Sequence, residues 1–444
     1  RTFKFRDEFH RKGIAEKAIS LLTSDIDVSP MVIDGGWGTG KTEFCHKLIN
    51  LMKKESDNHH IIYIDAFQAD HADEPLLTVL AEILKLIPDE EQRNSVMKKV
   101  IPAVRYGLRT ILKAAVSHAL RQDTSDITDD FDKEITQAAD KAIDASVESL
   151  LKDHIKASES LETLKTTLKE IATEKPIILF IDELDRCRPD FAVNMLEMIK
   201  HTFDVEGVNF VLITNTTQLK ASINHCYGDS VDAQRYLDKF LKFTFKLPHQ
   251  FKKNGHKKIQ ASIAHYQNLI TQSSILKTTE LIQKAPFDLV TRIIEINLLS
   301  LREIETLVRY LEIYQRLTAD KGLSGYMTFG YELLSLFGVI LSCIKPELAR
   351  SIVTGRVDAK ELGSFLGDNK IVDFGEERFF PEVYQVILTM LAQECYLSAE
   401  LFTPESEKSQ QDWKTKIEAY FDHCEPPKKL DVVVEAIDVL TFYN

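Results

Sequence analysis

Long hydrophobic runs are missing from this sequence. Its 444 residues contain no uncharged apolar stretch of about eighteen residues and no pattern typical of a secretory signal. The most apolar candidate, residues 100–120, carries Arg105, Arg109, Lys113 and His118, and such side chains are costly in lipid. We therefore expect a soluble protein without a membrane span.

Cysteine-based patterns are also scarce. The six cysteines, at positions 45, 187, 226, 343, 395 and 424, form no C-x-x-C pair and no cluster with histidine at zinc-binding spacing. This spacing favours a cytoplasmic protein with free, reduced thiols. Internal repeats and low-complexity segments do not occur either, so a solenoid or a disordered tract is not predicted.

A general excess of basic residues is absent too. The chain has 55 Lys and Arg against 68 Asp and Glu, which argues against a protein that binds nucleic acid along its whole surface. Two basic stretches nevertheless stand out, one from Lys98 to Arg121 without any acid and one from Arg235 to Lys258 with a single acid. Nucleic acid could bind either one, and a partner protein or an acidic lipid surface could bind the first. A solvated face is the more common origin of such stretches.

Short apolar runs alternate with helical patterns over the first 250 residues. Helical spacing is found at residues 9–22, 41–52 and 191–203, and Pro75 could start a further helix. Strands that alternate with helices predict an α/β fold with a mainly parallel sheet covered on both faces. The five predicted strands are residues 31–33, 61–64, 177–181, 209–213 and 243–245.

Two regions lack strand signals. Residues 89–172 have almost no glycine, and Ala, Leu, Lys and Glu recur at helical spacing. The chain from Phe251 onward also reads as helical. In the last strand, Phe243 and Phe245, with Phe240 just before it, are expected to face the core. The predicted organisation is a core of residues 1–88 and 173–250, a helical insertion at 89–172, a helical lid at 251–320 and a C-terminal helical domain at 321–444.

A glycine-rich segment stands between the first strand and the next helix. Residues 35–42 match the pattern G-x-x-x-x-G-K-[ST], in which backbone N–H groups turn toward the phosphates of a nucleotide. Lys41 is expected to reach the β- and γ-phosphates, and the Thr42 hydroxyl to bind Mg²⁺. The predicted nucleotide-binding residues are Gly35, Gly36, Trp37, Gly38, Thr39, Gly40, Lys41, Thr42 and Glu43.

Polar side chains follow the third and fourth strands. Asp182 and Glu183 end an apolar run, and parallel sheets bind ligands beyond the carboxyl ends of their strands. We expect Asp182 to hold Mg²⁺ through water and Glu183 to deprotonate the attacking water. Asn215, with Thr214 beside it, is the candidate to hold that water. An N-cap of the next helix is an equally good reading of Asn215.

Several of these segments resemble the KAP family of P-loop NTPases, a branch near the AAA+ and STAND ATPases. Residues 36–42 are similar to its G-x-W-G-[ST]-G-K-[ST] loop, in which Trp37 is the distinctive residue. Residues 181–187 resemble its hhDDLDRC signature, with Glu183 in place of the second Asp. Residues 63–68 and 236–248 are similar to two further segments of the family.

The resemblance implies an ASCE sheet in which the strand at 209–213 lies between the first and third strands. It also implies ATP and Mg²⁺ as cofactors and hydrolysis as the activity. Residues 300–304 are similar to the N-P-R-x-h motif of a helical lid, with Leu301 in place of proline, so Arg302 is a candidate sensor. Bacterial relatives are commonly linked to defence against phages and plasmids.

An arginine near the γ-phosphate would accelerate phosphoryl transfer. The candidates are Arg186, Arg188, Arg235 and Arg302, although a surface or salt-bridged arginine is the more common case for each. An arginine that acts in trans requires a homo-oligomer, and Arg235 precedes the strand where related ATPases often place one.

Three functions remain open on the sequence. The first is a regulatory ATPase that switches its assembly state and signals to a separately encoded effector, since the chain has no recognisable nuclease, deaminase or protease motif. The second is a nucleic-acid-stimulated motor or loader. The third is a scaffold that holds ATP without hydrolysing it. The presence of an acid at Glu183 is evidence against this function. ATP is the expected nucleotide because the guanine-reading N-K-x-D pattern is absent from its usual place.

Overall fold

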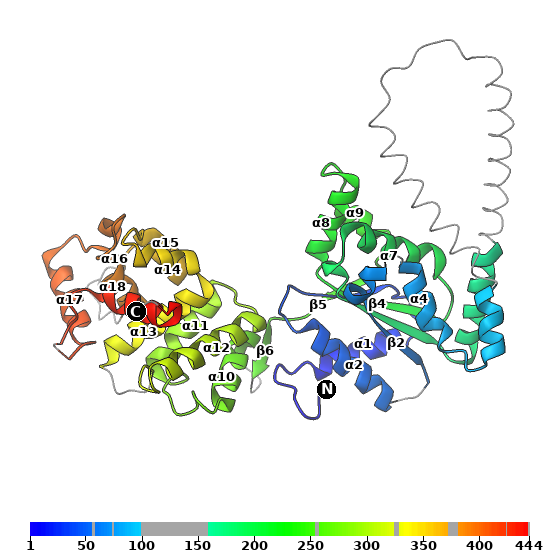
Figure 1. The fold of residues 1–444 in the computed structure, drawn as a ribbon, viewed down its shortest axis with the longest axis horizontal. Helices are drawn as coiled ribbons and strands as arrows, with labels where there is room; N and C mark the ends of the chain where they lie inside the picture. Colours follow the sequence, from blue (N-terminus) through cyan, green and yellow to red (C-terminus); the bar gives the residue numbers. More distant parts are fainter. Residues whose placement is uncertain are drawn as a thin grey trace, which may run out of the picture. The chain divides into compact units, whose positions relative to one another are not determined.

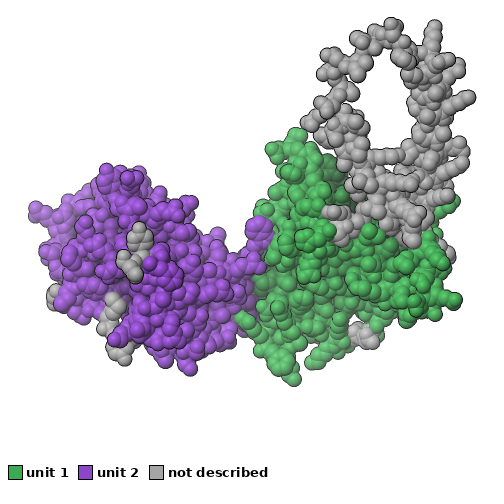
Figure 2. All heavy atoms as spheres, viewed as in Figure 1, with its two compact units in different colours: residues 1–7, 11–36, 40–247 green, residues 8–10, 37–39, 248–444 purple. Residues whose placement is uncertain are grey.

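The chain divides into two compact units, each with its own core, which Figure 2 draws in green and purple. The computed structural model describes residues 1–55, 58–72, 75–98, 159–253, 257–323, 328–371, 381–422 and 424–442. The first unit comprises Arg1–Asp7, Arg11–Gly36 and Gly40–Leu247, and the second Glu8–His10, Trp37–Thr39 and Pro248–Asn444. Three residues of the glycine-rich loop, Trp37–Thr39, therefore group with the second unit.

A five-stranded parallel sheet forms the centre of the first unit. Its order is β2-β3-β4-β1-β5, so β4 lies between β1 and β3, as the resemblance implied. All four strand pairings are parallel, which confirms the α/β fold expected from the sequence. The strands are β1 (Met31–Asp34), β2 (His60–Asp65), β3 (Ile177–Asp182), β4 (Val208–Thr214) and β5 (Phe243–Lys246).

Helices cover both faces of this sheet (Figure 1). Alternate residues of one strand point to opposite faces: Met31 and Ile33 pack with α1 and α2, whereas Val32 packs on the face covered by α4, α7 and α8. The apolar side chains of β3 are fully buried on both faces, which explains its uninterrupted apolar run. The helices are α1 (Lys12–Leu22), α2 (Lys41–Glu55), α3 (Ala66–Ala69), α4 (Pro75–Leu84), α7 (Pro189–Thr202), α8 (Thr216–Tyr227) and α9 (Ala233–Asp238).

The predicted helical insertion is described only at its ends. Residues 90–98 and 159–174 are helical. The stretch from Lys98 to Arg121 lies outside the described residues apart from Lys98 itself. Among the helices that are described, none combines the length and the apolar character needed to cross a membrane.

The last strand of the sheet is less buried than the sequence predicted. Phe240 is buried, but Phe243 is 37% exposed and Phe245 is only partly buried against the α1 and α2 face. The expectation that all three rings face the core was therefore wrong for Phe243. The reason is the position of β5 at the edge of the sheet, where helices protect a strand less than in the centre.

The second unit begins with a hairpin, which corrects the expectation of helix from Phe251 onward. The strands β6 (Gln250–Lys253) and β7 (Lys257–Gln260) pair antiparallel, with Phe251 opposite Ile259. Phe251 packs against the rings of Phe9 and His10, at centroid distances of 6.3 and 5.2 Å. These contacts join residues that are far apart in the sequence.

Helices make up most of the second unit, and one continuous core joins them from α10 to α18. The expected lid and C-terminal region thus share this core. Helix α13 is apolar on all sides because it lies in the middle of the core. The helices are α10 (Ala261–Gln272), α11 (Lys284–Ile296), α12 (Leu301–Leu317), α13 (Phe329–Ile344), α14 (Pro346–Val353), α15 (Ala359–Leu366), α16 (Val383–Ala392), α17 (Glu407–Glu418) and α18 (Lys429–Thr441).

The core around α13 provides a test of this packing. Phe337 is fully buried and its ring lies 6.1 Å from that of Phe365. We expect Phe337→Ala to lower the free energy of unfolding of the second unit by about 3–5 kcal/mol, since it removes buried surface and leaves a cavity. Urea unfolding followed by the fluorescence of buried Trp413 measures the loss. Tyr396→Ala, at a 74% exposed position, should change it by less than about 0.5 kcal/mol. Equal stability of the two variants would contradict this description of the core.

Candidate active site

The carboxyl ends of β1, β3 and β4 meet at one edge of the sheet. Asp34 at the end of β1 lies opposite Thr214 of β4, and Asp182 at the end of β3 lies opposite Ile213. The glycine-rich loop follows β1, Glu183 follows β3 and Asn215 follows β4. The parallel register therefore brings the three predicted polar segments to the same edge.

The glycine-rich loop needs glycine at two positions. Gly38 and Gly40 have φ angles of +73° and +81°, in the left-handed region that residues with a side chain rarely adopt. The loop ends where α2 begins at Lys41. An N–H-lined loop that leads into a helix N-terminus is a ready binding site for phosphate.

Lys41 points back into the loop. Its ammonium donates to the carbonyl oxygens of Gly35 and Gly36 at 2.6 and 3.1 Å. Burial lowers the pKa of Lys41, and the carboxylates of Asp185 and Asp182 act in the opposite direction. A buried ammonium held beside the loop is a strong ligand for a phosphate oxygen.

Asp182 is fully buried at the end of β3. Its carboxylate accepts hydrogen bonds from the Thr42 side chain, from the Glu183 N–H at 2.8 Å and from the Tyr63 hydroxyl at 3.2 Å. Burial raises the pKa of Asp182, and these three hydrogen bonds oppose that rise. The Thr42 hydroxyl and the Asp182 carboxylate offer adjacent oxygen atoms, the ligands that Mg²⁺ prefers, so this donor set fits the predicted metal.

Glu183 has an unusual backbone conformation. Its φ is 61° and its ψ is 25°, the left-handed region that is costly for a residue with a side chain. Its carboxylate oxygen Oε1 lies 2.9 Å from Nη2 of Arg186. Burial raises the pKa of Glu183, the Arg186 guanidinium opposes this, and the carboxylates of Asp182 and Asp65 add to it. A raised carboxylate pKa is what a general base needs.

Asn215 occupies the position of a helix N-cap. Its Oδ1 accepts from the Thr217 N–H at 3.1 Å at the start of α8. The N-cap reading is therefore realised, and it uses the carbonyl oxygen of the side chain rather than the amide nitrogen. Thr214 is fully buried and donates to Asp185 at 3.1 Å, so it serves the packing of the strand end.

The other arginines differ in their surroundings. Arg188 is held by Asp70. Its Nε and its backbone N–H donate to the Asp70 carboxylate at 3.1 and 3.0 Å, and its Nη2 donates to the Asp70 backbone oxygen at 2.8 Å. Arg235 is 86% exposed and lies 3.4 Å from Asp232, on α9. Arg302, in the first turn of α12, is exposed, and its guanidinium makes no ion pair with a described residue.

In the second unit, the loop lies close to Arg302. A Cβ atom added to Gly38 would stand 3.0 Å from the Cβ of Arg302 and 2.7 Å from the hydroxyl of Ser300. The Leu301 N–H donates to the Gly38 carbonyl at 3.0 Å. Gly38 of the predicted loop therefore contacts the predicted sensor motif.

Three acidic or phenolic side chains of the site were missed from the sequence. They are Tyr63, which donates to Asp182, Asp185, which accepts from Thr214, and Asp34, which accepts from the Thr216 N–H at 2.9 Å. Tyr63 and Asp182 belong to neighbouring strands 119 residues apart. Asp34 and Asp185 had a weak signal, because each stands next to a predicted motif.

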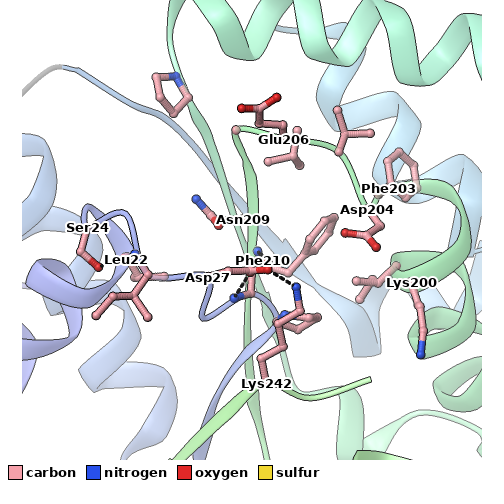
Figure 3. A pocket seen from close by; sticks show the side chains of 18 of the residues that line it. Leu22, Ser24, Asp27, Lys200, Phe203, Asp204, Glu206, Asn209, Phe210 and Lys242 are labelled. Carbon is pink, nitrogen blue, oxygen red and sulfur yellow. Dashed lines mark hydrogen bonds and ion pairs between the residues drawn. The ribbon is translucent and has the colours of Figure 1, made fainter. Parts of the chain in front are cut away.

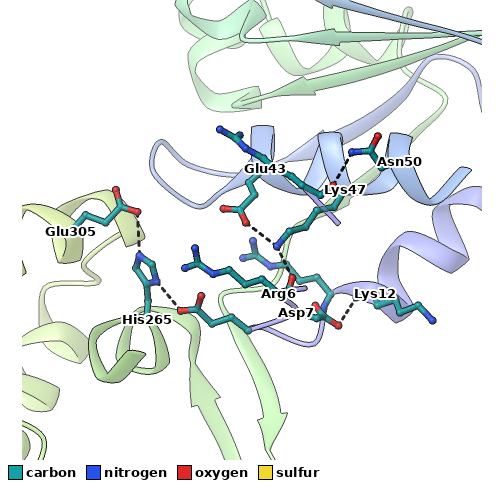
Figure 4. Close-up of polar contacts among 11 residues, drawn as sticks. Arg6, Asp7, Lys12, Glu43, Lys47, Asn50, His265 and Glu305 are labelled. Carbon is teal, nitrogen blue, oxygen red and sulfur yellow. Dashed lines mark hydrogen bonds and ion pairs between the residues drawn. The ribbon is translucent and has the colours of Figure 1, made fainter. Parts of the chain in front are cut away.

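Charged groups beside the site are largely paired, as Figure 4 shows for Glu43 and Lys47. Glu43, predicted to bind nucleotide, forms an ion pair with Lys47 at 2.8 Å, and Lys47 also donates to the backbone oxygen of Arg6. Separately, in the second unit, the His265 ring lies between the carboxylates of Glu8 and Glu305, at 2.7 and 3.2 Å.

Part of the basic stretch from Arg235 to Lys258 also interacts with other side chains. Lys242 forms an ion pair with Asp27, and the Lys239 ammonium lies 5.7 Å from the centre of the Tyr236 ring. Both contacts lie within the first unit. This pairing supports the reading of the stretch as an ordinary surface.

A cavity of about 640 Å³ lies at the amino ends of the strands, opposite the candidate active site (Figure 3). Its lining includes Pro30 before β1, Pro176 before β3 and Val208 at the start of β4. These residues mark the amino ends of the strands, so the cavity does not belong to the candidate active site.

Residues 11–318 match the KAP family P-loop domain, which is well over half of the chain. The chain belongs to the KAP family of P-loop NTPases. The match includes the loop, the β3 strand end and α12 but stops before most of the second unit, whose last described helices lie outside it. Family membership and the strand order together identify the fold as that of a P-loop NTPase.

Among curated proteins, none matches this KAP-family chain. Among solved structures, it is similar to the ORC2 protein of Aeropyrum pernix, in a structure of ADPNP–ADP complexes. The two chains are 12% identical, the alignment covers 97% of this chain and 94% of the other, and the TM-score is 0.34.

Proposed function

We propose that this protein hydrolyses ATP in the presence of Mg²⁺. The observation that carries the proposal is the end of β3, where Asp182 hydrogen-bonds Thr42 of the phosphate loop and Glu183 follows directly. A scaffold that only binds ATP needs the phosphate loop. It does not need a second acid, such as Glu183, whose raised pKa suits a general base. The paired acids thus favour hydrolysis over binding alone.

The phosphate loop and its neighbours would bind the triphosphate. Loop N–H groups and the Lys41 ammonium contact the phosphate oxygens, and Lys41 leaves its carbonyl partners to do so. Thr42 and Asp182 would hold Mg²⁺, Asp182 through water. When bound, the metal neutralises charge on the β- and γ-phosphates.

Glu183 acts as the general base. Its carboxylate takes the proton of the attacking water, and Arg186 fixes its orientation through the ion pair at 2.9 Å. The left-handed backbone at Glu183 turns the side chain at the strand end, and such strain is typical of active sites. Arg186 is thereby a positioning residue.

Asn215 is proposed to hold the attacking water with its amide nitrogen while its oxygen caps α8. We expect Asn215→Asp to keep the cap, since aspartate is an equally good N-cap, and to remove the amide donor. Phosphate release should fall at least about tenfold, with thermal stability unchanged. Thr217→Ala, which keeps the capped N–H, is the matched control and should retain the parent rate. An Asn215→Asp variant as active as the parent would show that Asn215 caps α8 and does not hold the attacking water.

Arg235 and Arg302 are proposed for different roles at the γ-phosphate. Arg302 lies beside Gly38 in the second unit and suits a sensor in cis. Exposed Arg235 suits a finger that reaches the site of another subunit, which requires a homo-oligomer. A protein that is monomeric at the concentrations at which it hydrolyses ATP would rule out the trans role.

For the biological role, we propose a switch whose assembly follows the nucleotide state and which signals to a separately encoded effector, in defence against phages. Its support is the KAP family membership. The basic stretch from Arg235 to Lys258 gives little support to a motor that tracks nucleic acid, since two of its charges, Arg235 and Lys242, form ion pairs.

Mg²⁺-dependent phosphate release from ATP, measured with and without DNA and RNA, tests the proposal. Release that needs Mg²⁺ and ignores nucleic acid is the expected result. Stimulation by DNA or RNA would move the function to a motor or loader. Tight ATP binding without any release, in the presence of candidate effectors as well, would establish the scaffold instead.

A further inference from the structure

One hydrogen bond within the second unit joins the phosphate loop to the start of α12. The Leu301 N–H donates to the Gly38 carbonyl at 3.0 Å. Leu301 is the first residue of α12, and the amide of a first helical residue has no acceptor inside its own helix. The loop carbonyl therefore supplies the acceptor that this amide lacks.

The start of α12 is otherwise fixed by its own side chains. Ser300 and Glu303 form a capping box, in which the Ser300 N–H donates to Glu303 at 2.7 Å and the Glu303 N–H donates to the Ser300 hydroxyl at 3.3 Å. Further along the helix, Ile304 and Leu307 are fully buried in the core of the second unit. The donor at Leu301 is thus held in place by a rigid helix.

Contact between the loop and α12 is close enough to require glycine. A Cβ on Gly38 would lie 2.7 Å from the Ser300 hydroxyl and 3.0 Å from the Arg302 Cβ. The φ of +73° at Gly38 also excludes most side chains. Both features keep the Gly38 carbonyl within reach of the Leu301 N–H.

The direction of this carbonyl determines the direction of the next N–H. In a trans peptide, the C=O of one residue and the N–H of the following residue point in opposite directions. With the Gly38 oxygen turned to α12, the Thr39 N–H is turned away from it. Phosphate loops bind anions through N–H groups on their inner side.

We propose that Leu301 is a positioning residue for the nucleotide site. Its backbone N–H holds the peptide between Gly38 and Thr39 in the orientation that turns the Thr39 N–H away from α12, which is the orientation that phosphate binding by this N–H needs. A ligand that shifts α12 within the second unit would release this peptide and weaken nucleotide binding. This inference rests on the proposed nucleotide site but not on hydrolysis.

The test is equilibrium binding of ADPNP with Mg²⁺ to the full chain, by calorimetry and by fluorescence of Trp37, which is 51% exposed whereas the other tryptophan is buried. Leu301→Pro removes the N–H at a position where proline fits a helix. The variant should bind ADPNP about three- to tenfold more weakly, which is the usual contribution of one hydrogen bond to affinity.

Two control variants separate the bond from other effects. Leu301→Ala keeps the N–H and removes the side chain. Glu407→Pro removes the corresponding amide of α17, a helix of the same unit that also has a serine N-cap. Both should bind ADPNP within about twofold of the parent. Parent-like binding by Leu301→Pro, or equal weakening by Leu301→Ala, would overturn the proposal.

Hydrogen exchange in the parent protein gives an independent measurement, which also decides the matter if Leu301→Pro does not fold. The Leu301 amide should exchange more slowly than that of Glu407, for which the described residues offer no backbone acceptor. Equal exchange rates would show that the bond is not formed. A parent protein that binds ADPNP but does not hydrolyse ATP would contradict the proposed function and would not contradict this inference. A parent protein that binds neither nucleotide would contradict both.

Discussion

Glu183→Gln is expected to lower the rate of ATP hydrolysis by about 10²- to 10⁴-fold, the usual contribution of a general base. Glutamine keeps the size of the side chain and an oxygen for Arg186, so it removes the base and little else. ATP affinity should stay within about threefold of the parent value. Phosphate release and ATP binding, measured on the same preparation, check both halves of this expectation.

The pH dependence of turnover adds a second test of Glu183. Burial raises the pKa of its carboxyl, and the base is lost as the pH falls through that value. The parent rate should therefore decline on the acid side above the ordinary glutamate pKa of about 4.3, and this limb should vanish in Glu183→Gln. Glu206→Gln, at an exposed acid of the same unit, should match the parent throughout. A Glu183→Gln protein with the parent rate would exclude Glu183 as the base.

Lys41→Ala is expected to weaken ATP binding about 100-fold. The ammonium donates two hydrogen bonds to loop carbonyls in the structure, and with nucleotide present it would donate to phosphate oxygens instead. Hydrogen bonds between charged groups contribute roughly 1.5–3 kcal/mol each, and about 2.7 kcal/mol corresponds to a 100-fold change. Calorimetric titration with ATP and Mg²⁺ measures the change.

A matched control for Lys41 exists in the same helix. Lys54 is exposed in the last turn of α2, so Lys54→Ala removes an equal charge far from the loop. It should bind ATP within about twofold of the parent. Equal losses in both variants would mean that net charge, rather than a specific contact, drives binding. Unchanged affinity in Lys41→Ala would place the nucleotide elsewhere.

Local patterns in the sequence predicted the sheet, and they also led to the residues of the candidate site. Five consecutive apolar residues, 177–181, indicate a strand buried on both faces because side chains on each of its faces are apolar. The spacing of Gly35, Gly40 and Lys41 indicates a phosphate loop because it lets the backbone N–H groups and the lysine surround an anion. Asp182 and Glu183 follow directly from the end of the strand.

Features that depend on distant pairing were not predictable in the same way. The Tyr63 hydroxyl reaches Asp182 because β2 and β3 align in one register, and no local pattern specifies a register. The exposure of Phe243 depends on β5 being an edge strand. Asn254 and Gly255 stand between β6 and β7 in the sequence, and Asn-Gly is a strong hairpin signal that the helical reading of this region overlooked.

The α12 motif shows the same limit. The sequence marked Leu301 as a departure from the proline of the similar lid motif. It did not show that the departure adds a donor, because the acceptor is the Gly38 carbonyl of a distant segment. Proline has no N–H, so this contact depends on the residue that made the resemblance less complete.

The grouping of Trp37–Thr39 with the second unit has a consequence for the order in which the protein is made. Ribosomes add about 5–20 residues per second, and α12 begins about 260 residues after Gly38, so the loop waits roughly 10–50 s for its partner. During that interval the nascent chain already carries Lys41 and Thr42, yet the Gly38 carbonyl lacks the N–H donor that Leu301 of α12 supplies. The phosphate loop is thus completed only after about 260 further residues have been synthesised.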